Sequence, residues 1–418
     1  MKQAVFAVFA AVLFTVLPVA GQRNALVKNL VQNRYRIEFR EGRLSGPGAE
    51  LLDALIAESH FVLIGEEHGV AEIPDFAGAV CQGAARHGYR TMAIETSPRI
   101  AAELQRWTTS GDGRARLLEF TRTFPNTIPF YDIEEEYALL GQCARAFGEP
   151  FRLWGLDQEF LGSADFLLSR IIETRPGKEA AAMAEHLLKR SRDADARARQ
   201  TGSVNDLYAV SASRDDLLNL RRLLDDQGAA EARLWMDALI RTHEIYNKRV
   251  NGAPYDSDLS RALLMKETFA RYYASASDPA GLGPKVLLKF GANHMYRGAN
   301  FRLIHDLGNY VAEIAAGRGL KSLHVLVLAA RGTQLRFTRV GAPYEAKMFR
   351  LGDGDSPLEA LKPAVDSLFS EGWTLFDLRP IRKELTSLRQ IDTELERVIL
   401  GFDLLVLIPK ASAATQIR

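Results

Sequence analysis

The sequence predicts a layered α/β fold, with a central, largely parallel sheet flanked by helices and a helical insertion between two core strands. Short, almost continuous apolar runs recur along the chain, and such runs are typical of strands buried on both faces. Helical patterns lie between these runs, as in βαβ units. From about 164 to 280, helix formers dominate and strand patterns are almost absent.

The elements are expected in the following order. A helical, charged lead-in at 24–41 precedes an amphipathic helix at 50–59. Seven strands are expected, at 61–65, 91–94, 151–155, 286–291, 323–328, 334–340 and 404–408. Helices are expected between the early strands and inside the insertion, at 75–87, 134–147, 178–199, 215–224 and 231–250. The last ~100 residues either complete the sheet or form a separate module, because domain sizes allow both.

Residues 1–21 have the pattern of a secretory signal peptide. Lys2 supplies a positive start, an apolar run covers 4–16, and Val19 and Gly21 place small residues before a cleavage site at Gln22. The run is shorter than the roughly 20 apolar residues of a membrane span, although an uncleaved anchor is the alternative. We therefore expect an exported protein, periplasmic or secreted, whose mature chain 22–418 has no stable membrane span.

The charge balance bears on the class of partner. The 418-residue chain has 53 basic and 52 acidic residues, a formal net charge of +1. No single-sign field is available to attract nucleic acid, so a nucleic-acid partner is not expected. A small-molecule substrate is expected instead.

The chain has two cysteines, Cys81 and Cys143. An oxidising compartment permits a bridge between them. Both lie in segments predicted as helices beneath strands, so we predict two buried free thiols, with the disulfide as the alternative. Two cysteines at this spacing do not support a cysteine-based zinc site.

Acidic or histidine side chains follow four of the predicted strands. Glu66 and His68 follow the first strand, Glu95 the second, Asp157 the third and His294 the fourth. In open α/β sheets, ligands bind outside the carboxyl ends of the strands, so these side chains are expected to share one cleft. Two imidazoles with two or three carboxylates can activate water, by general base action or through a metal.

Two of these residues have a structural alternative. Asp157 also suits a helix N-cap, and His294 suits a hydrogen-bonded structural histidine. If strand geometry persists, Glu66 and His68 point to the same side and Glu67 points elsewhere. The coincidence at four strand ends favours a site. The remaining histidines lack an acidic partner at a strand end and are expected to be structural: His60, His87, His186, His243, His305 and His324.

Several other chemistries lack their motifs. The sequence has no Gly-x-Ser-x-Gly nucleophile elbow. It has no phosphate-binding loop or dinucleotide Gly-rich turn after the first strand, and no His-Glu-x-x-His helix.

The four strand ends resemble the superfamily that includes erythromycin esterases, the ChaN haem-binding lipoproteins and the Tiki proteins. Members carry a Gly-Glu-x-(x)-His turn after the first strand, which matches Gly65-Glu66-Glu67-His68 here. The superfamily's acid after the second strand matches Glu95, and its late histidine matches His294. The similarity covers most of residues 50–300.

Two further segments are similar to the esterase branch. The stretch 154–158 looks like its Gly-x-Asp turn, and 260–265 looks like its Arg-Asp-x-x-Met helix, although Ala262 replaces the acid. The single residue between Glu66 and His68 is closer to the ChaN and Tiki form.

The resemblance implies, first, an exported hydrolase of an ester or related acyl bond that requires no cofactor. Glu95 and His294 would orient and deprotonate a water, while Glu66 and His68 would hold the site's polarity or share the base role. Arg261 or Arg297 would stabilise the oxyanion. The expected catalytic set is therefore Glu66, His68, Glu95, Asp157, Arg261 and His294.

Two alternatives remain open. One is a non-covalent haem-binding protein of ChaN type, with His68, His294 or Tyr296 as axial ligands. The other is a Tiki-like peptidase that depends on a divalent metal.

Overall fold

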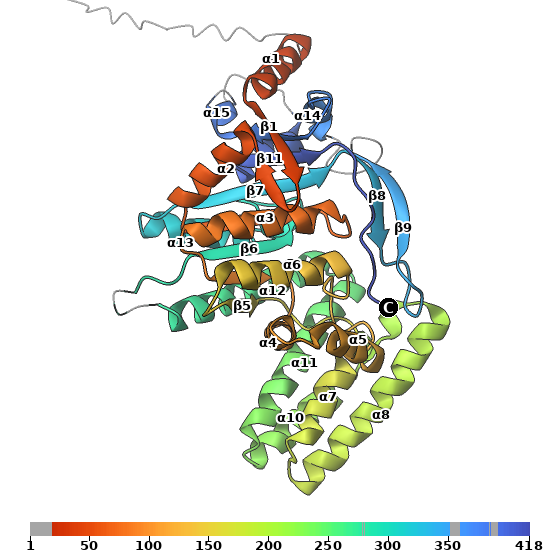
Figure 1. Cartoon of the computed structure of the whole chain (residues 1–418). Coiled ribbons are helices and arrows are strands. Elements are labelled where there is room, and N and C mark those ends of the chain that lie inside the picture. Colours follow the sequence, from red (N-terminus) through yellow and green to blue (C-terminus); the bar gives the residue numbers. More distant parts are fainter. Residues whose placement is uncertain (1–18, 278, 280, 352–359, 384, 386–391) are drawn as a thin grey trace, which may run out of the picture.

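A central sheet organises the molecule (Figure 1). The computed structural model describes residues 19–277, 279, 281–351, 360–383, 385 and 392–418. In this part of the chain, nine strands form one sheet in the order β2-β1-β10-β11-β7-β3-β6-β4-β5. The strands are β1 (Arg34–Arg40), β2 (Arg43–Ser45), β3 (Phe61–Glu66), β4 (Thr91–Ile94), β5 (Arg152–Gly155), β6 (Val286–Gly291), β7 (Ser322–Ala329), β10 (Trp373–Asp377) and β11 (Leu404–Ile408).

The six strands from β11 to β5 pair in parallel, whereas β10, β1 and β2 join as antiparallel neighbours. The predicted α/β class with a largely parallel sheet is therefore confirmed. The late strands β7, β10 and β11 complete this sheet, so the end of the chain contributes to the same core.

Both faces of the sheet are buried, which explains the continuous apolar runs. On β3, Val62 and Ile64 pack into one hydrophobic cluster, and Phe61 and Leu63 pack into another. Successive side chains of a strand point to opposite faces, so the two clusters lie on the two sides of the sheet. Helices α3 and α6 contribute to the first cluster, and α12 and α13 contribute to the second.

The helices lie in three groups. Those around the first cluster are α2 (Pro47–Glu58), α3 (Glu72–Arg86), α4 (Pro98–Thr108), α5 (Gly113–Thr123) and α6 (Glu134–Phe147). Those at the termini and over the second cluster are α1 (Val19–Gln32), α13 (Leu307–Gly317), α14 (Lys362–Val365), α15 (Arg379–Arg382) and α16 (Thr393–Gly401), with the 3-10 turn η2 (Ala292–His294) after β6.

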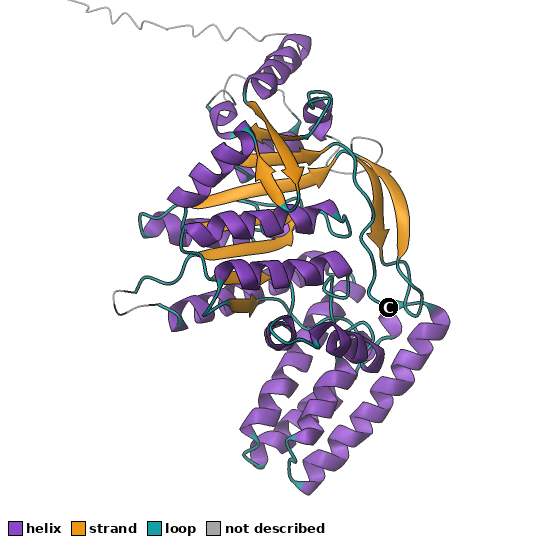
Figure 2. Cartoon of the chain, viewed as in Figure 1, coloured by secondary structure: helices purple, strands orange, loops and turns teal. Residues whose placement is uncertain are grey.

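The third group comes between β5 and β6 in the sequence. It comprises α7 (Ala164–Glu173), α8 (Lys178–Thr201), η1 (Val204–Asp206), α9 (Tyr208–Ser211), α10 (Arg214–Asp226), α11 (Ala230–Val250) and α12 (Pro254–Ser275). Most of these helices form a bundle that extends away from the sheet, while α12 returns to it (Figure 2).

Some strand predictions were wrong. The segment 24–41 is helical only to Gln32 and continues as β1, where Ile37 is buried and its charged neighbours are not. The strand expected at 334–340 begins earlier, as β8 (Arg331–Arg336), and pairs with β9 (Glu345–Arg350) in a separate two-stranded ribbon. Strands β9 and β10 were not anticipated.

The prediction of two free thiols was also wrong. Cys81 on α3 and Cys143 on α6 form a disulfide, with their Cα atoms 5.3 Å apart. The two helices pack side by side on the same face of the sheet. A Cβ on Gly78 would lie 1.9 Å from Oε1 of Gln142 on α6, so a larger residue there would displace the side chain of Gln142. Sequence patterns cannot reveal that two distant helices are neighbours, and that contact is what brings the sulfurs together.

Most of the predicted signal peptide lies in residues 1–18, outside the described residues. Among the helices that are described, none is both long and apolar enough to cross a membrane.

Candidate active site

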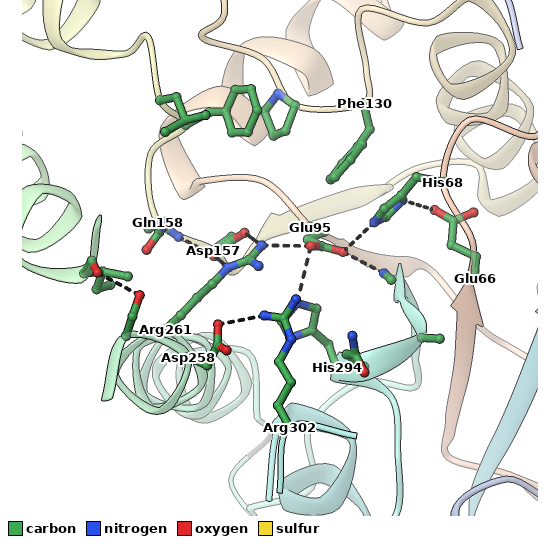
Figure 3. A pocket seen from close by; sticks show the side chains of 18 of the residues that line it. Glu66, His68, Glu95, Phe130, Asp157, Gln158, Asp258, Arg261, His294 and Arg302 are labelled. Carbon is green, nitrogen blue, oxygen red and sulfur yellow. Dashed lines mark hydrogen bonds and ion pairs between the residues drawn. The ribbon is translucent and has the colours of Figure 1, made fainter. Parts of the chain in front are cut away.

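Strands β3, β6, β4 and β5 are consecutive in the sheet and parallel, so their carboxyl ends meet at one edge. A cavity of about 750 Å³ opens there (Figure 3). Its lining includes all six residues expected to be catalytic: Glu66, His68, Glu95, Asp157, Arg261 and His294.

Glu95, directly after β4, is the centre of the polar network (Figure 3). Nε2 of His68 lies 3.4 Å from its Oε2, and Nε2 of His294 lies 3.4 Å from its Oε1. Arg261 on α12 donates to Oε1 at 2.8 Å, and the backbone N–H of Gly291 donates to Oε2 at 2.6 Å. One carboxylate thus faces four donors, three of them from cationic or protonatable side chains.

A second carboxylate orients each imidazole from its other nitrogen. Nδ1 of His68 lies 2.9 Å from Oε1 of Glu66. Nδ1 of His294 lies 2.9 Å from Oδ2 of Asp306, the N-cap residue of α13. Both rings therefore direct Nε2 at Glu95, because a carboxylate on Nδ1 fixes the ring orientation. Asp306 was missed in the sequence because no strand precedes it.

Electrostatics favour the charged forms of this cluster. Burial would lower the pKa of both imidazoles, but Glu95 and Glu66 raise the pKa of His68 to about 10. Asp306 and Glu95 likewise raise the pKa of His294 to about 9. Burial would raise the pKa of Glu95, but the two imidazoles hold it well below its usual range. At neutral pH the cluster is a carboxylate between two imidazolium rings.

Arg261 also binds Asp157, the acid after β5. Its Nε donates to Oδ1 of Asp157 at 2.9 Å, and one terminal nitrogen contacts Oδ2. Oδ1 of Asp157 also accepts the backbone N–H of Gln158 at 2.8 Å. The N-cap alternative for Asp157 was therefore wrong, since the next helix begins only at Ala164.

Gly291 is required where β6 approaches the cluster. A Cβ at this position would lie 2.8 Å from Nε2 of His68 and 3.2 Å from Oε2 of Glu95. Any larger residue would displace the imidazole or the carboxylate.

A buried charge cluster lies behind Glu66. Lys289 on β6 donates to Oε1 of Glu66 at 2.6 Å and to both oxygens of Glu136 on α6, at 2.8 and 2.9 Å. All three side chains are almost fully buried. Lys289 and Glu136 were missed, because a single polar residue inside an apolar run has no recognisable motif.

Other neighbours of His68 come from distant segments. The ring of Phe130, in the loop before α6, stacks on the imidazole with ring centroids 3.7 Å apart. Gln334 on β8 donates to the backbone oxygen of His68 at 2.7 Å. Glu67 also lines the cavity.

Two residues named in the sequence analysis lie elsewhere: Tyr296, a possible haem ligand, and Arg297, a possible oxyanion stabiliser. Tyr296 is fully buried in the hydrophobic cluster, with its ring against Phe301 and Phe402. Arg297 binds Asp403 at 2.8 Å. Neither residue lines the cavity, and nor do the six histidines expected to be structural.

The outer part of the cavity combines apolar and cationic side chains. Arg249 and Arg302 both bind the carboxylate of Asp258 and are about half exposed. Apolar lining comes from Pro129, Phe130, Phe160, Leu161, Ile245, Phe301 and Leu328.

The site residues fit a metal or haem poorly. Within the described residues, no group of three or more His, Cys, Asp or Glu side chains is arranged to hold a metal ion. Each imidazole Nε2 faces Glu95 and each Nδ1 faces another carboxylate, so an axial ligand would first have to leave these partners. Tyr296 is not at the cavity at all.

Comparisons with known proteins identify the fold. No family model matches the sequence, and a search of curated proteins found no match. Among solved structures, a histidine-to-asparagine mutant of the erythromycin esterase EreC, in its open conformation, aligns over 92% of this chain and 99% of its own, with a TM-score of 0.61 and 15% identity.

Two other solved structures align over most of their length. A succinoglycan biosynthesis protein aligns over 95% of this chain and 99% of its own, with a TM-score of 0.57 and 14% identity. A Bacillus cereus protein aligns over 96% and 100%, with a TM-score of 0.58 and 14% identity. The chain therefore shares the fold of an erythromycin esterase, which confirms the sequence resemblance at the level of fold.

Proposed function

We propose that this protein hydrolyses an ester or related acyl bond. The observation that carries the proposal is the pair of carboxylate–imidazole units, Glu66–His68 and Asp306–His294, whose Nε2 atoms converge on Glu95. In such a unit the carboxylate fixes the tautomer and the orientation of the imidazole, which can then take a proton from water. A fold shared with a known esterase supports the same reaction class.

In this proposal His68 is the general base. Its side chain is 28% exposed, against 10% for His294, so it has better access to a water in the cavity. Once neutral, His68 takes the proton of a water whose oxygen bonds to the acyl carbon. The imidazolium of His68 then returns this proton to the alcohol oxygen as the acyl C–O bond breaks. Arg261 and the imidazolium of His294 stabilise the negative charge that develops on the carbonyl oxygen. The proposed roles of His68 and His294 are thus reversed relative to the sequence-based expectation.

The outer lining supports a substrate with an apolar body and an anionic group. Arg249 and Arg302 share the single carboxylate of Asp258, which leaves one net positive charge and unused N–H donors. Phe130, Phe160 and their apolar neighbours supply the remaining contact surface. A carboxylate-bearing ester or lactone has this chemistry.

The test is hydrolysis of a panel of esters and lactones, with and without a carboxylate group. His68→Gln and Glu95→Gln are expected to lower kcat/KM by a factor of about 10²–10⁴. The matched control is His186→Gln, an exposed histidine on α8. If both site variants hydrolysed every substrate as fast as the control, the proposal would be wrong.

Two additional measurements distinguish the alternatives. Activity on peptides that a chelator abolishes would favour a metal-dependent peptidase. A Soret band on haem titration that disappears in His68→Gln would favour haem binding.

We also propose that the protein is exported. The pattern of residues 1–21 supports this, and so does the Cys81–Cys143 disulfide, because disulfides persist in oxidising compartments. N-terminal sequencing of the protein from its own host should then begin at Gln22, whereas a chain beginning at Met1 would contradict the proposal.

A further inference from the structure

Lys289 is a lysine in the middle of a buried strand. Its side chain is 1% exposed, and its neighbours Leu288 and Phe290 on β6 are fully buried. A charge removed from water costs several kcal/mol unless it is paired and hydrogen-bonded. An apolar residue would fill this position at no such cost, so the fold alone does not explain a lysine here.

The contacts of Lys289 show where its charge acts. Its ammonium group has three N–H donors. One oxygen of Glu66 and both oxygens of Glu136 accept hydrogen bonds from them. Oε1 of Glu66, which accepts from Lys289, is the same atom that faces Nδ1 of His68. Oε2 of Glu66 is buried without a hydrogen-bond partner. One oxygen therefore carries both contacts and links the buried cluster to the imidazole.

We propose that Lys289 and Glu136 are positioning residues, which hold Glu66 in the rotamer that orients the imidazole of His68. Glu136 fixes the ammonium group from the side of α6, and the ammonium fixes Oε1 of Glu66 at the end of β3. These contacts connect α6, through Lys289 on β6, to Glu66 and the cavity. The inference rests on the proposed role of His68 as the base. Neither Lys289 nor Glu136 belongs to a motif that could be recognised in the sequence.

The charges around Glu136 support a coupling between the cluster and the site. The groups that face it are Lys289 from β6, Glu66 from β3, and His68 and Tyr131 from the loops. Burial raises the pKa of Glu136 to about 7, against the lowering effect of Lys289. The charge of Glu136 acts on His68 through this dry region, where interactions are stronger than in water.

The first experiment measures His68 directly by NMR of ¹⁵N-histidine-labelled protein, with its signals assigned through His68→Gln. Glu136→Gln removes a negative charge, leaves the ammonium of Lys289 less compensated and so weakens proton binding at His68. The titration midpoint of His68 should fall by roughly half a unit to one unit. The control is Glu135→Gln, because Glu135 also lies on α6 but, among the described residues, its one hydrogen-bond partner is the backbone N–H of Thr415 at the surface. A midpoint equal to that of the control would overturn the proposal.

The second experiment removes the pair without leaving a buried unpaired charge. The double variant Lys289→Met with Glu136→Gln removes one positive and one negative charge, so it should fold, as near-UV circular dichroism can verify. Glu66 then loses its anchor. The Nδ1–H signal of His68 should broaden, and kcat should fall roughly tenfold or more with KM little changed. An unaltered Nδ1–H signal in a folded double variant would also overturn the proposal.

The NMR measurements need no substrate. If the wild-type protein hydrolysed none of the esters, the proposed reaction would fail, while the coupling of Glu136 and Lys289 to His68 would still be decided.

Discussion

At the scale of single residues, His68 determines how the proposed reaction depends on pH. A general base must be neutral to accept a proton, and Glu95 and Glu66 raise the pKa of His68 to about 10 although burial opposes this. His294 must stay protonated to stabilise the oxyanion, and its pKa is about 9. We therefore expect kcat/KM to rise nearly tenfold per pH unit from neutral pH, to pass through a maximum between pH 9 and 10 and to fall above it. A pH–rate profile of the best ester substrate tests this expectation. A plateau already reached at pH 7 would exclude His68 as the base.

Gly291 provides a second prediction at this scale. In Gly291→Ala the new Cβ would meet Nε2 of His68 at 2.8 Å, so the imidazole must move by part of an ångström. We expect kcat to fall about 100-fold, because displacements of this size in a catalytic group have such effects. The matched control is Gly317→Ala at the end of α13, where a Cβ meets nothing within 4 Å. Similar kinetics in both variants would show that the imidazole tolerates the displacement.

The residues that the sequence identified share one property: each follows a predictable strand or lies in a segment with a family resemblance. Glu95 and His294 were found because the carboxyl ends of parallel strands meet. Three residues that contact the site were missed: Asp306 binds His294 from a helix cap, Lys289 binds Glu66 from a strand interior, and Gln334 binds the backbone of His68 from a separate ribbon. Their positions depend on tertiary packing, which no local pattern encodes.

At the scale of elements, burial made several strands recognisable in the sequence, although β10 was missed while it too is buried. Strands β3, β4, β6 and β11 are buried along almost their full length and form apolar runs in the sequence. Strand β1 alternates charged and apolar residues at the antiparallel end of the sheet, and β9 is exposed, so neither forms such a run. The same limit explains why the contact between α3 and α6, and with it the disulfide, was not foreseen.

The disulfide leads to a prediction about these two helices. Cys81 and Cys143 are 62 residues apart, and the bridge restricts the unfolded chain over that length. The double variant Cys81→Ala with Cys143→Ala should lose roughly 2–4 kcal/mol of the free energy of unfolding. Urea unfolding with and without a reductant measures this. The reductant should destabilise the wild type and leave the variant unchanged, and a wild type insensitive to reductant would contradict the prediction.

At the scale of the whole molecule, the site places opposing demands on the fold. The buried cluster is held together by charged imidazoles, whereas the proposed chemistry needs one of them neutral. Protonated His68 and His294 bind Glu95, Glu66 and Asp306 most strongly. Raising the pH therefore activates the base and weakens the contacts that position it.

This opposition predicts how stability depends on pH. The pKa values of His68 and His294 are raised from 6.5 to about 10 and about 9, so the folded state holds protons that the unfolded state releases. The resulting stabilisation is fully present below pH 6.5 and is lost as the pH rises through 9 and 10. Allowing for partial solvent screening, the loss should be on the order of 3 kcal/mol.

Urea unfolding at pH 6.5 and at pH 10 measures the loss directly. The dependence of the free energy of unfolding on pH arises from the two protons on His68 and His294. The double variant His68→Gln with His294→Gln should therefore be less stable than the wild type at pH 6.5, and its stability should be nearly independent of pH above that value. His186→Gln, exposed on α8, should retain the wild-type slope. A wild-type protein equally stable at both pH values would show that these imidazoles are not held in the charged form, and the expected alkaline rise in activity would then lose its basis as well.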